Sequence, residues 1–252
     1  MKPIDLTVII NLHNEGEVCR ATFASVNHAA RIAAQEGFRI EVLALLDSAD
    51  DTTQETAAEV LGPIGRMETV QYRDLGASRN AAVASAQGRF LSFIDGDDLF
   101  HSNWLRDLLL YEKNQTDKVI WHPQYNFYFG DSVAVFEHID MEDPRFQPEQ
   151  LCIDNYWTAL AAAPKAVFEA FPYIHVHKEA GIGLEDWAWN MATIGGGYLH
   201  KCVPNTWHGI RSKSNGSMLD STRKNKLMAP FTAEYKDWLI RQNNKHETLN
   251  GK

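Results

Sequence analysis

The sequence has few cysteines, no long apolar run and no glycine-rich phosphate loop after its first predicted strand. The three cysteines, Cys19, Cys152 and Cys202, are far apart and lack metal-ligand spacing, so we expect a reducing, cytoplasmic setting. No apolar run approaches the roughly 20 residues of a membrane-spanning helix. The first apolar stretch ends at Asn11 and His13, which is not the pattern of a signal peptide.

Positive charge is also scarce, because 24 Lys and Arg residues stand against 33 Asp and Glu residues, for a formal net charge of −9. Nucleic-acid binding depends on cationic side chains that neutralise phosphates, so we expect no nucleic-acid partner. What the chain does have is 252 residues of ordinary globular composition, 44% hydrophobic and 23% charged. That is enough for a folded domain with a sizeable core.

Two hydrophobic periods alternate over the first hundred residues. Short continuous apolar runs predict strands that are covered on both faces, and apolar residues at helical spacing predict the helices between them. The alternation of strand and helix implies a parallel sheet with helices on both faces. The expected strands are 6–10, 40–46, 67–72 and 89–94, and the expected helices are 18–36, 53–61 and 77–87.

The pattern is mixed beyond residue 100. Gly130 and Asp131 between two aromatic or β-branched runs predict a hairpin of 118–129 with 132–137. The tail from His208 is polar and basic, and we expect a mobile loop there before a terminal helix over 234–241. The other expected elements are helices over 101–112, 157–163 and 185–194 and a strand over 198–203.

Acidic side chains follow predicted strands where open α/β sheets bind their ligands. Asp47 follows the second strand, and Asp95, Asp97 and Asp98 follow the fourth. Carboxylates so close together repel one another unless a cation or solvent screens them, and their oxygens suit Mg²⁺ or Mn²⁺. A third acidic turn holds Glu185 and Asp186. Each turn could instead only cap the helix that follows it.

In combination these motifs resemble the family 2 glycosyltransferases with the GT-A fold. The resemblance rests on 7–15, on the turn at Asp47, on 76–98 with its Asp95-Gly96-Asp97 motif, and on the Glu185-Asp186 pair. It implies an α/β fold of GT-A type, a Rossmann-like, mostly parallel sheet flanked by helices with a mixed C-terminal acceptor-binding half. We expect a single domain over 1–252, with a nucleotide-sugar-binding half at 1–100, an acceptor and catalytic half at 101–215, and a tail and helix at 216–252.

The resemblance implies an inverting transfer of a sugar from a nucleotide-diphosphate donor to a hydroxyl of a glycan or lipid-linked acceptor, in polysaccharide or cell-surface glycan biosynthesis. A Mn²⁺ or Mg²⁺ ion held by Asp95 and Asp97 would neutralise the leaving diphosphate. Asp186 would be the general base for the acceptor hydroxyl, with Glu185 as the alternative base or as a group that orients the acceptor. Trp187 would stack on the acceptor sugar.

The resemblance also implies a set of donor-binding residues from both halves. Arg79 could reach the diphosphate or form a structural salt bridge instead. One alignment of the late basic segment places Lys213 where many relatives have a metal-ligating histidine, and another favours His208. An imidazole could ligate the metal, whereas an ammonium could only contact phosphate as a point charge, so we favour His208 for the metal and Arg211 and Lys213 for the diphosphate. The alternative is a solvated basic loop that binds neither. The full donor set is Asn11, His13, Asn14, Glu15, Asp47, Arg79, Asp95, Gly96, Arg211 and Lys213.

His175 and His177 lie two residues apart and would share one face of a strand, where they could form half of a metal site, contact the acceptor or be plain surface residues. Two other functions were weighed. A nucleotidyltransferase that makes the activated sugar would carry a glycine-rich, basic loop after its first strand, and a noncatalytic binding module would have no reason to keep its acids. A dehydrogenase lacks support because no G-x-G-x-x-G follows a strand. A lipid-linked acceptor would be met peripherally at the inner membrane face, or through partner modules of a larger assembly.

Overall fold

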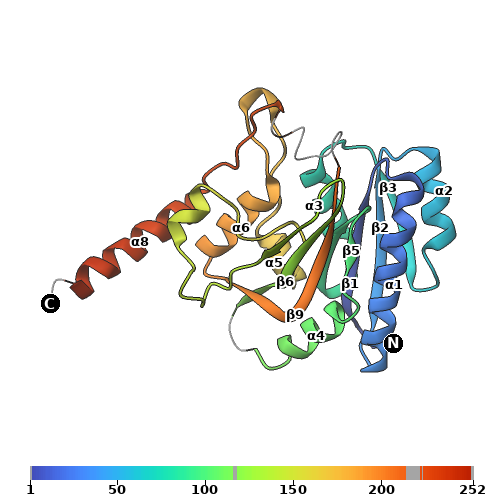
Figure 1. Ribbon diagram of the computed structural model, residues 1–252, viewed down its shortest axis with the longest axis horizontal. Coiled ribbons are helices and arrows are strands. Elements are labelled where there is room, and N and C mark those ends of the chain that lie inside the picture. Colours follow the sequence, from blue (N-terminus) through green and yellow to red (C-terminus); the bar gives the residue numbers. More distant parts are fainter. Residues whose placement is uncertain (1, 116–117, 214–221, 223, 251–252) are drawn as a thin grey trace.

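The computed structural model describes residues 2–115, 118–213, 222 and 224–250, with side chains as far as residue 244. In this part of the chain a nine-stranded sheet is flanked by helices (Figure 1). The strands are β1 (Ile4–Leu12), β2 (Ile40–Asp47), β3 (Gly65–Val70), β4 (Gly88–Asp95), β5 (Leu99–Phe100), β6 (Val119–Gly130), β7 (Ala134–Glu137), β8 (Ala162–Pro164) and β9 (Leu199–Ser212). The helices are α1 (Cys19–Gln35), α2 (Asp51–Val60), α3 (Leu75–Ser85), α4 (Trp104–Glu112), α5 (Lys165–Ala170), α6 (Glu185–Gly195) and α8 (Ala233–Asn250).

The sheet is mostly parallel, in the order β3-β2-β1-β4-β8-β6-β9-β5, with β7 paired to β6. Strands β1 to β4 run parallel, as do β6 and β9, whereas β8 is antiparallel to both of its neighbours. The register sets Asn11 of β1 beside Leu45 of β2 and Asp95 of β4. The carboxyl ends of these strands therefore share one edge, which we call the carboxyl edge and which lies at the top of the sheet in Figure 1.

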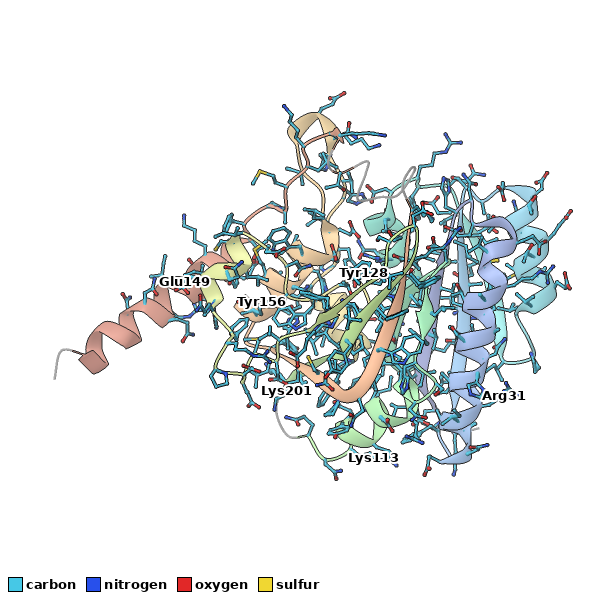
Figure 2. All side chains as sticks on the ribbon, in the orientation of Figure 1. Arg31, Lys113, Tyr128, Glu149, Tyr156 and Lys201 are labelled. Carbon is cyan, nitrogen blue, oxygen red and sulfur yellow. The ribbon has the colours of Figure 1, made fainter. Side chains whose placement is uncertain are left out.

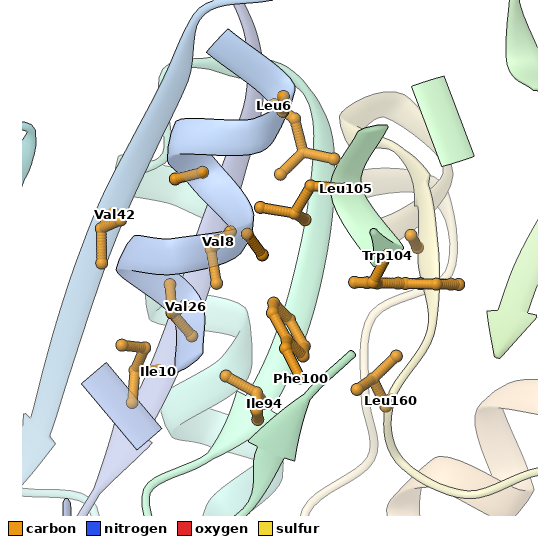
Figure 3. Packing of buried hydrophobic residues seen from close by; sticks show 14 of the residues in the cluster. Leu6, Val8, Ile10, Val26, Val42, Ile94, Phe100, Trp104, Leu105 and Leu160 are labelled. Atoms are coloured by element: carbon orange, nitrogen blue, oxygen red, sulfur yellow. The ribbon is translucent and has the colours of Figure 1, made fainter. Parts of the chain in front are cut away.

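The side chains of β1 alternate between two buried faces of the sheet. Val8 and Ile10 pack in the cluster that contains α1 and α4, and Ile9 packs in the cluster that contains α3 and α5. Figure 3 shows Val26 of α1 between Val8 and Ile10 of β1, with Trp104 of α4 farther along the same layer. Because both faces are covered, β1 has a continuous apolar sequence rather than an alternating one.

The structure confirms the strands and helices predicted for the first hundred residues, with ends shifted by one or two residues. It also confirms the β6–β7 hairpin, in which Tyr128 pairs with Ala134 across Gly130. The helix expected over 185–194 is α6, and the helix expected over 101–112 begins three residues later, after the short strand β5. The expected terminal helix lies within α8.

Two predictions for the second half of the chain are wrong. Residues 157–163 do not form a helix, because Ala162–Pro164 form β8 between β4 and β6, where small side chains fit between two strands. The loop expected from residue 208 is a strand as far as Ser212, because β9 pairs with β6 up to Gly130. Residues 214–221 and 223 of the predicted tail lie outside the described residues.

The strand expected at His175 and His177 is also absent from the described structure. His177 forms only an isolated bridge with Ile182, and the Nδ1 atom of His175 lies 3.6 Å from an oxygen of Asp74. The two imidazole rings are 6.4 Å apart. No group of three or more potential metal ligands occurs there or elsewhere among the described residues.

Three other histidines are buried in the core around Trp157. His122 Nε2 lies 2.8 Å from His200 Nδ1, and the His200 ring stacks on Trp157 with a centroid distance of 4.4 Å. His138 lies 2.6 Å from the carbonyl of Pro123. Burial lowers the pKa of His138 and of His200 to about 3 and lowers that of His122 well below its usual value. All three imidazoles are therefore neutral in the folded protein at neutral pH.

This cluster predicts acid sensitivity. Below about pH 6.5 the unfolded chain protonates these histidines while the folded chain does not, so the free energy of unfolding should fall as the pH decreases. Between about pH 7 and pH 5 the loss should reach up to about 2 kcal/mol for each histidine. The imidazole NMR signals of His138 and His200 should be those of neutral rings over this range. Titration of all of them near pH 6.5 would contradict the prediction.

Candidate functional site

The carboxyl edge brings together side chains from β1, β2 and β4. Asn11 and Asp95 are register partners, and Asp47 ends β2 on the other side of β1. The start of α6 reaches the same edge, because one arginine contacts both Asp95 and Glu185. Acids that are far apart in the sequence thus meet at one place.

Arg79 of α3 is that arginine, and its side chain is only 1% exposed. One terminal nitrogen lies 2.5 Å from an oxygen of Glu185, and the other lies 3.4 Å from an oxygen of Asp95. The guanidinium also covers the ring of Tyr173 at 5.2 Å from its centroid. Of the two alternatives for Arg79, the structure has the salt bridge, which leaves no open face toward a diphosphate. Arg79 instead holds the start of α6 against the end of β4.

Glu185 and Asp186 are adjacent but lie in different environments. The carboxylate of Glu185 is buried against Arg79, whereas Asp186 as a whole residue is only partly buried. Burial and the charge of Glu185 raise the pKa of Asp186, and the charge of Arg79 opposes them; the resulting pKa is about 7. Leu184, just before the pair, has a left-handed backbone with φ of 57°, which for a leucine is strained. Adjacent residues in the first turn of a helix project in directions roughly 100° apart, which places the two carboxylates in different surroundings.

Trp187 is partly buried in a third apolar cluster, which includes Leu151 and Tyr235. Its indole N–H donates to the carbonyl of Leu151 at 2.8 Å. The polar edge of this ring is thus used within the protein, and stacking on an acceptor sugar stays a prediction for its exposed part.

The Asp95-Gly96-Asp97 motif presents two different carboxylates. The Asp95 side chain is 40% exposed, whereas the Asp97 side chain is 12% exposed and lies 2.5 Å from the ammonium of Lys213. Arg211 is a more distant neighbour of Asp97, at 3.9 Å. A Cβ atom at Gly96 would come within 2.5 Å of Leu12 and 2.9 Å of a backbone oxygen. Only glycine therefore lets the motif fold this closely onto β1.

His208 does not join Asp95 and Asp97. Its Nε2 atom lies 2.8 Å from Asp98, which also accepts the main-chain N–H of Arg211 at 2.8 Å. The reason is the pairing of β5 with β9, which sets His208 beside Phe100. The expected three-ligand metal set of Asp95, Asp97 and His208 is therefore not assembled in the described part of the chain. Burial raises the pKa of Asp98, and the contact with His208 opposes this shift.

His13 and Asn14, both predicted to bind the sugar donor, join the loop after β1 to the loop after β2. His13 Nδ1 lies 2.6 Å from the main-chain oxygen of Asp47. Asn14 accepts the main-chain N–H of Asp50 at 3.1 Å and contacts the His13 ring. Both side chains are exposed, so they shape the rim of the carboxyl edge as well as facing solvent.

Asn11 and Glu15 lie deeper. The amide nitrogen and oxygen of Asn11 are buried and have no hydrogen-bond partner among the described residues. Glu15 accepts the main-chain N–H of His13 at 2.6 Å. Burial raises the pKa of Glu15, and the nearby charges of Asp97 and Lys213 act on it in opposite directions. Glu15 therefore belongs to the same charged cluster as Asp97.

Asp47 is fully occupied by donors from the protein. Its carboxylate accepts main-chain N–H groups of Tyr72, Arg73 and Asp74 at 2.8, 2.9 and 3.2 Å, and the hydroxyl of Ser78 at 2.6 Å. Burial alone would raise its pKa, but these hydrogen bonds outweigh burial and lower it. Asp47 thus holds the loop before α3, in which Arg73 has a left-handed backbone.

A family model described as glycosyl transferase family 2 matches residues 7–171 of the chain. The chain belongs to this family. It is 28% identical over 107 residues to the succinoglycan biosynthesis protein ExoO of Rhizobium meliloti (strain 1021), a match that covers 42% of this chain and 29% of that protein. It is 30% identical over 83 residues to the putative glycosyltransferase EpsH of Bacillus subtilis (strain 168), covering 32% and 24%. The chain therefore aligns with less than a third of each of these curated relatives.

Solved structures support the same fold. The structure of S. aureus TarS 1–349 in complex with UDP-GlcNAc is similar with a TM-score of 0.68 at 14% identity, over 86% of this chain and 61% of that chain. The mannosyltransferase PcManGT from Pyrobaculum calidifontis, in complex with GDP-Man and Mn²⁺, is similar with a TM-score of 0.60 at 14% identity and the same coverage. The expected GT-A fold of this chain is thereby confirmed.

Two residues that shape the candidate site are not predicted from the sequence. Ser78 binds Asp47, and Tyr173 lies under Arg79, yet neither was singled out. Ser78 is part of the 76–80 motif, so its place beside Arg79 was the available signal. Tyr173 had no such signal, because nothing in its own sequence neighbourhood indicates a contact with α3.

The hydrogen bonds that the Asp47 carboxylate accepts predict that its charge stabilises the fold. Asp47→Asn should lower the free energy of unfolding by about 1–3 kcal/mol, because an amide cannot accept all four hydrogen bonds. Amide hydrogen exchange at residues 72–74 should become faster without any nucleotide present. Asp50→Asn in the same turn is the matched control, since Asp50 caps α2 and asparagine caps equally well. Unchanged exchange at 72–74 in Asp47→Asn would contradict this assignment.

Proposed function

We propose that this glycosyltransferase transfers a sugar, with inversion at the anomeric carbon, from a nucleotide-diphosphate donor to a hydroxyl of a glycan or lipid-linked acceptor. The observation that carries the proposal is the contrast between the two acids. The pKa of Asp186 is raised to about 7, whereas Glu185 forms a buried ion pair with Arg79. A carboxylate whose pKa lies near the working pH suits a general base. The name of one relative, a succinoglycan biosynthesis protein, supports polysaccharide biosynthesis as the setting.

In the proposed reaction Asp186 accepts the proton of the acceptor hydroxyl. The hydroxyl oxygen forms a bond to the anomeric carbon while the bond from that carbon to the diphosphate oxygen breaks, and the electron pair leaves with the nucleoside diphosphate. Attack on the face opposite the diphosphate inverts the configuration. Glu185 and Arg79 act as positioning residues, since their buried ion pair fixes the first turn of α6.

A nucleotide-diphosphate donor fits the carboxyl edge of the sheet. Asn11 has a buried amide with no partner in the described chain, next to the exposed carboxylate of Asp95. Arg211 and Lys213 provide positive charge beside Asp97, and their side chains are about one-third exposed (36% and 33%). The structures similar to this one were solved with UDP-GlcNAc and with GDP-Man, which supports a nucleotide sugar as the donor class.

The chemistry of this cluster fits a divalent cation. Asp95 and Asp97 offer hard carboxylate oxygens, which suit Mn²⁺ or Mg²⁺, and a similar structure contains Mn²⁺. When bound there, the cation would neutralise charge that develops on the departing diphosphate. His208 is committed to Asp98, so we propose Asp95 and Asp97 as the cation ligands and leave His208 as a structural partner.

The expected division of the chain remains a proposal: a donor-binding half at 1–100, an acceptor and catalytic half at 101–215, and a tail beyond it. A lipid-linked acceptor would have to be met at a membrane surface or through partner modules. Of the helices that the structure describes, none is long and apolar enough to cross a membrane.

Two variants separate the roles of the acidic pair. Asp186→Asn is nearly isosteric but cannot take the proton, so turnover should fall by about 10²-fold or more while donor binding and stability change little. Glu185→Gln leaves the buried Arg79 undercompensated, so it should lower the free energy of unfolding by about 3 kcal/mol or more and reduce turnover less. Steady-state kinetics and denaturant unfolding measure both effects. For the wild type, turnover should decline as the pH falls through about 7, where Asp186 takes up a proton.

The assignment is reversed if Asp186→Asn keeps near-normal turnover while Glu185→Gln is inactive. If both variants stay active, the base lies elsewhere. Separate calorimetric measurement of nucleotide binding ensures that a loss of turnover is not a loss of the donor site.

One variant and a chelator test whether turnover needs the cation. Asp97→Asn and excess EDTA should each reduce turnover by about 10²-fold or more, because the diphosphate charge is no longer neutralised. Asp143→Asn is the matched control, since Asp143 pairs with Arg145 in the loop after β7. Full turnover in excess EDTA would contradict the cation proposal and would not affect the assignment of Asp186 as the base.

A further inference from the structure

Lys213 occupies a defined position at the end of β9. Its ammonium lies 2.5 Å from Asp97. The residues just before it are anchored on both sides: the main-chain N–H of Arg211 donates to Asp98, and the main-chain oxygen of Ser212 accepts from Asp131 at 3.1 Å. Strand β9 therefore fixes the position of Lys213 beside Asp97. This contact is not a chance pairing of two mobile surface groups.

A second carboxylate lies near this ion pair. Glu15 lies in the loop after β1, and the charges of both Asp97 and Lys213 act on it. A Cβ atom at Gly96 would lie 3.2 Å from the Cγ of Glu15, so Glu15 packs directly against the acidic motif. One positive charge thus sits among carboxylates that would otherwise repel one another. This is the position at which a divalent cation would also be attracted.

We propose that Lys213 is a built-in counter-ion that competes with the divalent cation for Asp97 and turns to the donor diphosphate once the cation is bound. The inference rests on the proposed function, because it takes Asp97 as a cation ligand. Lysine suits this exchange, since its ammonium is a compact charge on a flexible stem and binds phosphate as well as carboxylate.

The exchange predicts that cation and nucleotide bind cooperatively. Without nucleotide, the cation must displace Lys213 from Asp97, so its apparent affinity is low. With nucleotide present, the displaced ammonium gains the diphosphate as a new partner, so each ligand raises the affinity for the other. A lysine that serves stability alone would change unfolding when removed but would leave cation affinity untouched.

The test is a Mn²⁺ titration followed by electron paramagnetic resonance, with and without UDP or GDP. Without nucleotide, Lys213→Met should bind Mn²⁺ about tenfold more tightly than the wild type. The gain in Mn²⁺ affinity on adding the nucleotide should be smaller in Lys213→Met than in the wild type. Lys213→Gln is a second uncharged variant and should behave in the same way. Lys201→Met is the matched control, because Lys201 forms a 2.7 Å ion pair with Glu142 away from the carboxyl edge (Figure 2).

Equal Mn²⁺ affinity of the wild type and both Lys213 variants without nucleotide would overturn the inference, and so would the absence of detectable binding in all three. The failure of the proposed cation site is a separate result. It would appear as unchanged Mn²⁺ binding in Asp97→Asn, whatever the Lys213 variants do.

Discussion

The buried ion pair between Arg79 and Glu185 is the contact on which the site depends. A charged side chain that is 1% exposed persists only with paired and well-placed partners. Arg79 has Glu185 on one side, Asp95 on the other and the Tyr173 ring beneath it. The pair therefore joins the end of a parallel strand to the first turn of α6, although 106 residues separate Arg79 from Glu185.

Asp47 supports this contact from a distance. Its carboxylate binds Ser78 and the loop before α3, so it sets where α3 begins and where Arg79 stands. Three residues with left-handed backbone lie along this path: Ser48, Arg73 and Leu184. Such strain persists when the surrounding hydrogen bonds determine the conformation, and it concentrates at functional sites. The three strained residues adjoin the acidic turns of this chain, which fits a site built for fixed geometry.

The acids of the site have different properties because their surroundings differ. Hydrogen bonds lower the pKa of Asp47, burial raises that of Asp186 to about 7, and burial raises that of Asp98 despite its contact with His208. One residue type thus supplies a loop anchor, a candidate base and a histidine partner. The role of each aspartate follows from the donors and charges around it.

The sequence by itself determined the parallel half of the fold and the gathering of Asp47 and Asp95 at one edge, since local periodicity defines strands and parallel strands end together. Only the tertiary structure decided the partners of Arg79, His208 and Lys213. Those partners come from elements about 100 residues away, and β8 likewise forms because β4 and β6 flank it. Periodicity reports which side chains share a face, whereas ion pairs and inserted strands depend on long-range packing that no local window of sequence contains.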